Sequence, residues 1–373
     1  MDHPTAVAAA REICPTPHRN AARLALTAIA LAVVASAASA QSSSVTLGGS
    51  IDLSARYVKN EGRDRRISLA QDGITPSELF LVGTEDLGGG LKAGFNLRSG
   101  VNADTGTSTA NSQFWNRRAT VSLMSNFGEI RMGRDYAPTF WNQTTFDVFG
   151  TNGVASSRNI PQFDVGLGRA VRVDNAVEYF LPPNLGGVYG QVTVAASEGA
   201  PASPTSVGNF GRYVGGRIGY ASGRLNTAMA YAAQRLDTIA GQPSHKVFNI
   251  GGSYDFSVVK LLGYYDREAE SYTGVDKKED RFSLSSSIPF GQSEIRLGGE
   301  RSKLDNKITK VSTKVTQLAL GYVYNLSKRT ALYGTASRIS NSGPVAVAIP
   351  GGPAAPIAGG TSQAAELGIR HSF

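Results

Sequence analysis

The clearest pattern along the chain is an alternation of apolar and polar residues. From 45 to 57 the odd positions are apolar or small and end in Tyr57, while the even positions are polar and include Asp52 and Arg56. Successive side chains of a strand leave opposite faces of the sheet, so this period of two predicts a strand with one apolar and one polar face. Residues 77–97 repeat the pattern as two runs around three glycines, 88–90, which predicts a β-hairpin.

Similar runs recur to the end of the chain, and each has about the length that crosses a bilayer as a tilted strand, roughly ten residues. We expect about sixteen strands, near 45–57, 77–87, 90–101, 113–124, 128–136, 171–181, 187–197, 211–221, 224–235, 245–255, 258–267, 280–289, 293–303, 313–325, 329–339 and 362–373.

The connections between these runs alternate in length. Short turns are expected at 88–90, 125–127, 182–186, 221–223, 255–257, 289–292 and 326–328, and long polar connections at 58–76, 137–170, 197–210, 268–279 and 340–361. Short turns at one rim and long loops at the other are typical of an outer-membrane barrel, whereas a soluble sandwich has no reason to sort its connections. The sequence therefore predicts an all-β fold, a transmembrane antiparallel β-barrel of about 16 strands.

The first forty residues have a different composition. Three arginines precede an apolar run at 24–34, and the small residues 38–40 follow it. This order is typical of a cleaved secretory signal peptide, and the run is too short for a spanning helix. We expect residues 1–40 to be removed and residues 41–373 to form a single barrel domain.

Composition limits the chemistry further. Removing the leader removes Cys14, the single cysteine, and lowers the formal charge from +8 to +7, because three arginines and two acidic residues go with it. An exported chain without cysteine has no disulfide. Its basic residues are spread over many strands rather than clustered, so nucleic acid is not an expected partner. We also find no metal-ligand spacing and no phosphate-binding loop, and we expect no cofactor and no metal.

Several stretches resemble the trimeric general porins of Gram-negative bacteria, in the branch typical of β-proteobacteria. They are VTLGGSIDLSARY at 45–57, GTEDLGGGLKAGF at 83–95, FGEIRMGRDY at 127–136, RVDNAVEY at 172–179, YNLSKRTALYG at 324–334 and LGIRHSF at 367–373. The resemblance covers the whole mature chain in order.

The resemblance implies a sixteen-stranded barrel in the outer membrane, assembled as a homotrimer, that passes ions and small hydrophilic solutes by passive diffusion. It also implies contact with outer-membrane lipid and lipopolysaccharide. The terminal Phe373 is implied to be the signal read by the outer-membrane assembly machinery.

In such porins the third long loop folds into the barrel and narrows it, and here that loop is 137–170. Its segment FDVFGTNG at 146–153 resembles the tip of the family's loop, which implies that Asp147 is the acidic residue of the constriction. Arg134 and Arg172 match the arginines of the facing wall. Alternation agrees for Arg172, whereas strict alternation from Ile130 and Met132 would turn Arg134 toward lipid. An arginine pair opposite a carboxylate would sort permeants by charge.

One pair departs from the family pattern. The family has an arginine where this chain has Glu78 and a carboxylate where it has Arg98. Both positions face the lumen by alternation and lie within diagonal reach across the hairpin at 88–90. We hypothesise that the two positions have exchanged charges, which would preserve local neutrality.

The remaining charged positions on the polar faces are further candidates for the lumen wall. They are Arg118, Glu178, Arg217, Lys260, Arg296, Glu300, Glu366 and Arg370. We expect a mild anion preference from them. Small residues on the same faces, including Gly251 and Ser285, suggest open space inside the barrel.

Three alternatives remain. A barrel enzyme needs a nucleophile beside a base, but the mature chain carries only His245 and His371, neither next to a recognisable serine motif, so we expect no enzyme. An adhesin-type barrel with a closed lumen and a substrate-selective channel are the other two.

Overall fold

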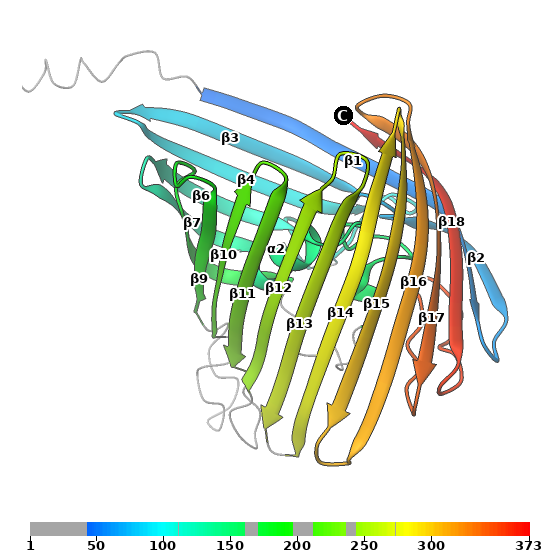
Figure 1. Ribbon diagram of the computed structural model, residues 1–373. Helices are drawn as coiled ribbons and strands as arrows, with labels where there is room; N and C mark the ends of the chain where they lie inside the picture. Colours follow the sequence, from blue (N-terminus) through cyan, green and yellow to red (C-terminus); the bar gives the residue numbers. More distant parts are fainter. Residues whose placement is uncertain (1–42, 111, 161–170, 197–211, 236–243, 273) are drawn as a thin grey trace, which may run out of the picture.

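The computed structural model describes residues 43–110, 112–160, 171–196, 212–235, 244–272 and 274–373. The expected signal peptide and Cys14 lie outside the described residues. In the described chain, neighbouring strands pair antiparallel, and pairing of β1 with β18 closes the sheet into a barrel (Figure 1). The predicted all-β barrel is confirmed.

The strands and the two short helices lie in the following order. They are β1 (Ser43–Asn60), β2 (Arg65–Gln71), β3 (Glu78–Gly88), β4 (Leu91–Asn102), β5 (Thr107–Ser108), β6 (Arg118–Ser125), β7 (Gly128–Tyr136), α2 (Pro138–Thr145), η1 (Ser157–Asn159), β8 (Arg172–Phe180), β9 (Val188–Ala195), β10 (Tyr213–Ser222), β11 (Leu225–Arg235), β12 (Ser244–Asp255), β13 (Lys260–Tyr272), β14 (Val275–Phe290), β15 (Ser293–Asn306), β16 (Val311–Asn325), β17 (Thr330–Ser342) and β18 (Thr361–Ser372).

These eighteen described strands make sixteen barrel strands. The first half of β1 pairs with β3 and its second half with β2, so β2 and β3 together form one interrupted strand. The two-residue strand β5, which pairs with the end of β4, is not counted as a barrel strand. The break between β2 and β3, residues 72–77, bears directly on the site described below.

Two expected loops contain strand instead. The connection predicted at 58–76 includes β2, whose outward Ile67 and Leu69 are too few, among charged neighbours, to show an alternation in the sequence. The connection predicted at 268–279 is mostly strand, because β13 runs to Tyr272 and β14 starts at Val275. Both faces there carry charged side chains, so no apolar face marked these strands. Conversely, the strand expected from 113 begins only at Arg118.

The outer and inner faces differ as the alternation predicts. On β16, Leu318 is 62% exposed on the outer face, while the adjacent Gln317 points inward and is 3% exposed. In the part of the chain that the structure describes, no helix has the length and apolar character of a membrane span.

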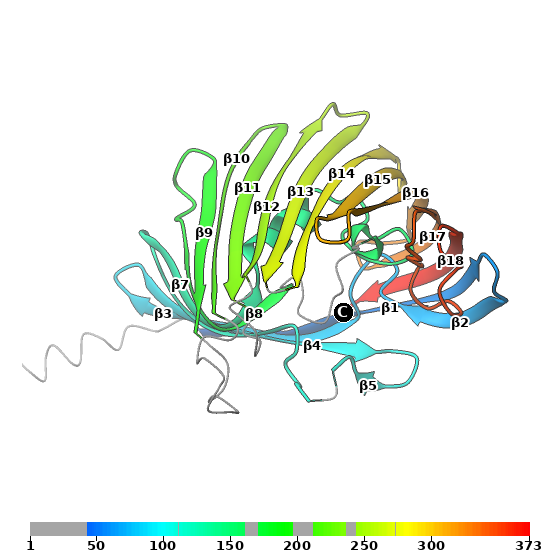
Figure 2. The same cartoon turned by 90° about the horizontal axis from the view of Figure 1, so that it is seen from below.

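The described part of the third loop, residues 137–160, lies inside the barrel. Figure 2 shows α2 enclosed by the ring of strands. Where the loop meets the far wall, the interior is apolar: Val154 and Ile160 of the loop pack with Val315, Ile339 and Ile349, the last from the connection between β17 and β18. The lumen is therefore partly filled by packed loops rather than uniformly lined by water.

Candidate functional site

An open cavity of about 900 Å³ lies between the third loop and the wall formed by β1 to β8. The loop side contributes Thr144, residues 150–153 and Arg158, and the wall contributes mainly charged side chains. The expected inward fold of the third loop places this cavity at the narrow part of the barrel.

Two phenylalanines hold the loop against the wall opposite the cavity. Phe146 is fully buried over Gly251 of β12, where a Cβ atom would lie 2.2 Å from its ring. Phe149 covers Gly298 and Gly321 of β15 and β16 in the same way, at 2.9 and 3.0 Å. A side chain at Gly251 would displace the ring, so the expectation that this small residue marks open space was wrong. Gly251 instead provides the space that the Phe146 ring occupies, and we call this site the socket of the loop.

Polar contacts reinforce this anchoring. The side chain of Asn142 in α2 donates to Asn249 at 3.1 Å, and Asn249 donates to the Thr139 carbonyl at 3.0 Å. Arg217 donates to Asn142 and to the Thr145 hydroxyl. Arg217 thus points into the barrel, as alternation predicts, but it binds the helix and does not line the open cavity.

The loop tip is fixed on its other side by a buried ion pair. Arg56 contacts the Glu366 carboxylate at 2.7 Å, and Glu366 also accepts the backbone N–H of Val154 at 3.1 Å. Gly153, with φ of +66°, leaves no room for a Cβ, which would lie 2.3 Å from the Gly73 carbonyl. The tip is wedged between β18 and the break in the second barrel strand.

Asp147 serves the loop itself. Its carboxylate accepts backbone N–H groups from Phe149, Thr151 and Ser157 at 2.8, 3.0 and 3.1 Å. It borders a small cavity on the far-wall side of the loop, not the arginine-lined one. Burial raises the pKa of Asp147, while these backbone donors act in the opposite direction. In this structure the carboxylate organises the loop, and the position at the constriction implied by the resemblance stays a prediction.

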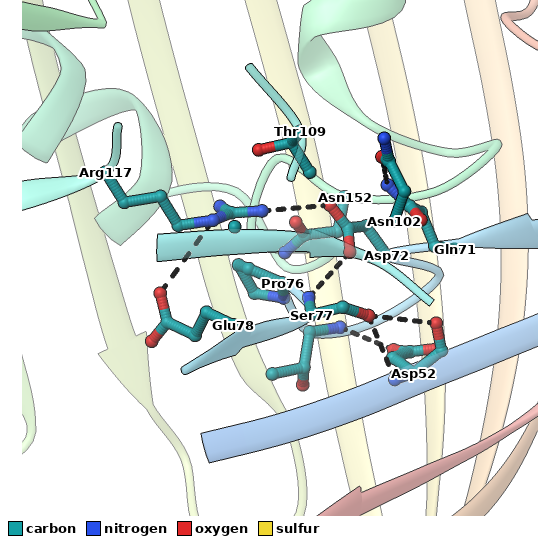
Figure 3. Close-up of polar contacts among 12 residues, drawn as sticks. Asp52, Gln71, Asp72, Pro76, Ser77, Glu78, Asn102, Thr109, Arg117 and Asn152 are labelled. Atoms are coloured by element: carbon teal, nitrogen blue, oxygen red, sulfur yellow. Dashed lines mark hydrogen bonds and ion pairs between the residues drawn. The ribbon is translucent and has the colours of Figure 1, made fainter. Parts of the chain in front are cut away.

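Carboxylates gather around the break between β2 and β3 (Figure 3), and two of them, Asp72 and Glu78, line the cavity. Asp52 is fully buried and accepts the N–H groups of Ile74 and Thr75, both at 2.8 Å. Asp72, in the left-handed region at φ +60°, accepts the Ser77 N–H at 2.6 Å. These bonds satisfy the backbone where the sheet pairing is lost, and they turn Asp72 and Glu78 toward the arginines.

Glu78 and Arg98 meet across the hairpin, as the sequence predicts, with 2.5 Å between Oε1 and Nη1. They are diagonal neighbours, because Glu78 is opposite Gly100 and Arg98 is opposite Phe80. A third residue joins them: Arg117 lies 3.2 Å from Asp72 and 3.9 Å from Glu78 (Figure 3). Glu78 therefore balances two arginines rather than one.

Arg134 reaches the cavity because β7 is irregular at this point. The pairing with β8 shifts between Gly133 and Asp135, and Gly133 has φ of +126°. The shift removes the conflict with strict alternation. Arg134 donates to the Asn116 carbonyl at 2.8 Å and forms an ion pair with Asp174.

Arg172 also lines the cavity, with a different set of partners. It donates to the Arg117 carbonyl at 2.9 Å and stacks on Tyr136 at 4.6 Å. No described carboxylate pairs with it. Arg118, by contrast, contacts Asp135 at 2.6 Å. Arg172 thus keeps its charge beside the cavity without a described counter-ion.

Arginines outnumber carboxylates around the cavity. The seven arginines that line it are Arg56, Arg98, Arg117, Arg118, Arg134, Arg158 and Arg172. Five of them have described acidic partners, which are Glu366 for Arg56, Glu78 for Arg98, Asp72 for Arg117, Asp135 for Arg118 and Asp174 for Arg134. Arg172 has no described acidic partner, so these groups leave a positive excess, and low-dielectric walls strengthen its field along the water path.

The other predicted residues lie elsewhere in the barrel. Glu178 is 2% exposed and accepts the Thr193 hydroxyl at 2.8 Å, outside the cavity. Lys260 and Arg296 lie near the short turns, where Arg296 contacts Glu294 at 2.9 Å. Phe373 closes the barrel seam: its N–H and C=O bond to Gly49 at 3.0 and 3.1 Å.

Sequence reasoning missed several cavity residues. Arg56 was visible on the polar face of the first strand, so alternation alone could have found it. Arg117 lies before β6 begins, where alternation carries no information, and Asp72 lies in a strand break that the sequence does not reveal. Arg158 belongs to the loop, where no periodicity applies.

The comparisons with known proteins identify the family. The family described as Gram-negative porin matches residues 25–344. The chain belongs to this family of porins. Among the described residues of the porin, no group of His, Cys, Asp or Glu is arranged to hold a metal ion.

Relatives match over almost their whole length. Outer membrane porin protein 32 of Delftia acidovorans is 36% identical over 355 residues, which are 92% of this chain and 99% of the relative. An outer membrane porin protein of Bordetella pertussis is 30% identical over 93% of this chain and 99% of its own length. The solved anion-selective porin from Comamonas acidovorans has a TM-score of 0.80 at 35% identity and covers 89% of this chain and 100% of its own. The protein is an outer-membrane porin.

Proposed function

We propose that the porin forms a water-filled channel that prefers small hydrophilic anions. The observation that carries the proposal is the excess of arginines over carboxylates around the cavity. The similar porin from Comamonas acidovorans, which is anion-selective, supports it. Arg172 and Arg134 would act as the positive wall, and the pair of Glu78 and Arg98 would add little net charge.

We propose further that three chains assemble into the functional unit. An OmpT structure from Vibrio cholerae, 13% identical with a TM-score of 0.65, is described as a trimer form, although that likeness shows only the fold. Phe373 would be read during outer-membrane assembly, and outer-membrane lipid and lipopolysaccharide would surround the complex. We propose no catalytic role for the porin.

Planar-bilayer recording tests the channel directly. Refolded porin should insert with conductance steps in groups of three, and its reversal potential in a tenfold salt gradient should have the sign of anion flow. A silent bilayer would indicate a closed adhesin-type barrel. A conductance that saturates with one class of anion would indicate a substrate-selective channel, and a cation-preferring reversal potential would contradict the proposal.

A further inference from the structure

One part of the cavity beside the third loop is lined by aromatic rings, and we call it the aromatic corner. Its rings are Tyr136, at the end of β7, and Phe140 and Trp141, in the first turn of α2. Tyr136 stacks on Phe140 with 5.4 Å between the ring centres, and Trp141 lies edge-on to Tyr136 at 5.2 Å. These side chains are half-buried, whereas Phe146 and Phe149, which hold the loop, are 0 and 5% exposed. The rings of the corner therefore keep part of their surface toward the cavity.

Arginine side chains lie against the same rings. The guanidinium of Arg172 is 4.6 Å from the centre of the Tyr136 ring, and that of Arg118 is 5.4 Å from it. The guanidinium of Arg158 is 5.8 Å from the centre of the Phe140 ring. A guanidinium is planar and stacks on aromatic faces. The aromatic corner thus offers flat ring surface and positive charge within a few ångströms of each other.

Arg172 has hydrogen-bond donors left for a ligand. Its Nε donates to the Arg117 carbonyl at 2.9 Å, and its Nη2 donates to the Tyr136 hydroxyl at 3.2 Å. Its Nη1 makes no hydrogen bond with the described residues, and no described carboxylate pairs with the side chain. Both existing acceptors are neutral oxygens, so an anion that enters the cavity would supply the missing counter-charge.

The part of the cavity beside the break at 72–77 has a different lining. There Arg98 and Arg117 are paired with Glu78 and Asp72. Arg98 also lies 4.7 Å from the centre of the Phe80 ring, but that ring does not line the cavity. A small inorganic anion is attracted by charge in either part, whereas a ligand that carries a ring finds aromatic surface in the aromatic corner.

We infer that the aromatic corner binds small aromatic carboxylates of the benzoate type, with the carboxylate on Arg172 and the ring against Phe140 and Trp141. This inference rests on the proposed anion channel, because the ligand has to enter the same cavity. Arg172 supplies a charge-assisted hydrogen bond. Contact with the rings and the stacked guanidinium groups adds an attraction that a saturated carboxylate of the same size does not gain. A bound ligand occupies part of the water path, so binding reduces the current of other ions.

Inhibition of the chloride current through refolded porin in a planar bilayer tests the inference. Benzoate should halve the single-channel current at a concentration at least about threefold lower than cyclohexanecarboxylate, which has the same charge and a similar size but no aromatic face. Benzamide, which has the ring without the charge, should need a concentration at least about tenfold higher than benzoate. Equal potency of benzoate with either of the other two compounds would overturn the inference, and these comparisons need no variant.

Two variants separate the ring from the charge. Trp141→Leu should remove most of the difference between benzoate and cyclohexanecarboxylate, and it breaks no described side-chain hydrogen bond, because the indole N–H has no partner among the described residues. Arg172→Gln should weaken both carboxylates by a similar factor. Phe282→Leu, which removes an outward-facing ring, is the control and should behave like the original chain. An unchanged preference for benzoate in Trp141→Leu would contradict the assignment of the aromatic corner.

The reversal potential distinguishes failure of this inference from failure of the proposed function. A silent bilayer or a cation-preferring reversal potential would contradict the anion channel itself. A porin that prefers chloride over potassium but does not distinguish benzoate from cyclohexanecarboxylate would remain an anion channel, and the aromatic carboxylate site alone would be wrong.

Discussion

The two walls that face the third loop use inward positions in opposite ways. On the wall from β1 to β8, inward residues are long and charged, and they border an open cavity. On the wall from β12 to β16, inward residues at the loop are small, and phenylalanines of the loop fill the space above Gly251, Gly298 and Gly321. Apolar packing thus holds the loop against the glycines, and the open cavity lies on the side lined by the arginines.

The two walls therefore have different tasks, although both show the same alternation of apolar and polar residues in the sequence. The glycine wall sets where the loop lies and hence how wide the channel is. The arginine wall sets which ions pass. Changes to one wall should therefore alter size or mobility, and changes to the other should alter selectivity, and the following experiments test that separation.

The largest effect is expected from Phe146→Ala. Removing a fully buried aromatic ring from a close-packed site costs about 3–5 kcal/mol, which shifts the docking equilibrium of the loop by more than about a hundredfold. We expect higher and noisier single-channel conductance and faster proteolysis within the loop. Phe282→Ala, which removes an outward-facing ring, is the matched control. Equal protease resistance of the two variants would show that the socket does not hold the loop.

The second effect concerns the charged wall. Arg172→Glu removes one arginine and adds one carboxylate, so the net charge around the cavity becomes two units more negative. The ratio of anion to cation permeability should fall several-fold toward one, because each unit charge contributes about 0.5–2 kcal/mol at distances near 8 Å between the dielectric of water and that near a protein surface. The reversal potential in a salt gradient measures it, and Arg172→Gln should give an intermediate value.

A second inward arginine, far from the cavity along the barrel, serves as a control for this experiment. Arg296→Gln removes an inward arginine near the short turns, where Arg296 is already paired with Glu294. Its effect on the permeability ratio should be smaller than that of Arg172→Gln. If both changes shift the ratio equally, the cavity has no special place in selectivity.

The alternation of apolar and polar residues determines how much of this arrangement can be predicted from the sequence. It reports which face a strand residue occupies, so the barrel, the pairing of Glu78 with Arg98 and the inward direction of Arg118 could be predicted. It does not report what covers an inward face, so it suggests open space at Gly251, where Phe146 of the loop lies.

Alternation also fails where strands are irregular or leave the hydrocarbon. The break after β2 places Asp72 beside Arg117, and nothing local in the sequence marks that break. The strands at 268–279 carry charges on both faces and therefore resemble a loop. The resemblance implies a position for Asp147 at the constriction, and the sequence does not show that its oxygens accept three backbone N–H groups.

The third test examines the charge pair within the arginine wall. Glu78→Gln should destabilise the barrel by about 1–3 kcal/mol, because it leaves Arg98 and Arg117 facing each other with one carboxylate fewer. Arg98→Gln should cost less, since Glu78 keeps Arg117. The midpoint of urea unfolding in detergent gives the order, and the double variant closes the cycle.

Coupling is the decisive quantity in that cycle. The double variant should cost less than the two single changes added together, both in stability and in its effect on ion selectivity. If the costs add to within about 0.5 kcal/mol and the selectivity shifts also add, the two side chains act independently and the hypothesis of exchanged charges fails.

The smallest effect on permeation is expected from Asp147→Asn, and it distinguishes the two walls most directly. A carboxylate at the constriction would oppose the arginines, so neutralising it would raise the anion preference. The structure instead has both oxygens accepting backbone N–H groups inside the loop, and an amide can satisfy only one side of that arrangement. We expect an unchanged reversal potential together with a loop that is cut faster by protease, consistent with a loss of about 1–2 kcal/mol of local stability. A shift in reversal potential without any change in proteolysis would return Asp147 to the water path, and would mean that the loop, rather than the wall facing it, also helps to select the ions.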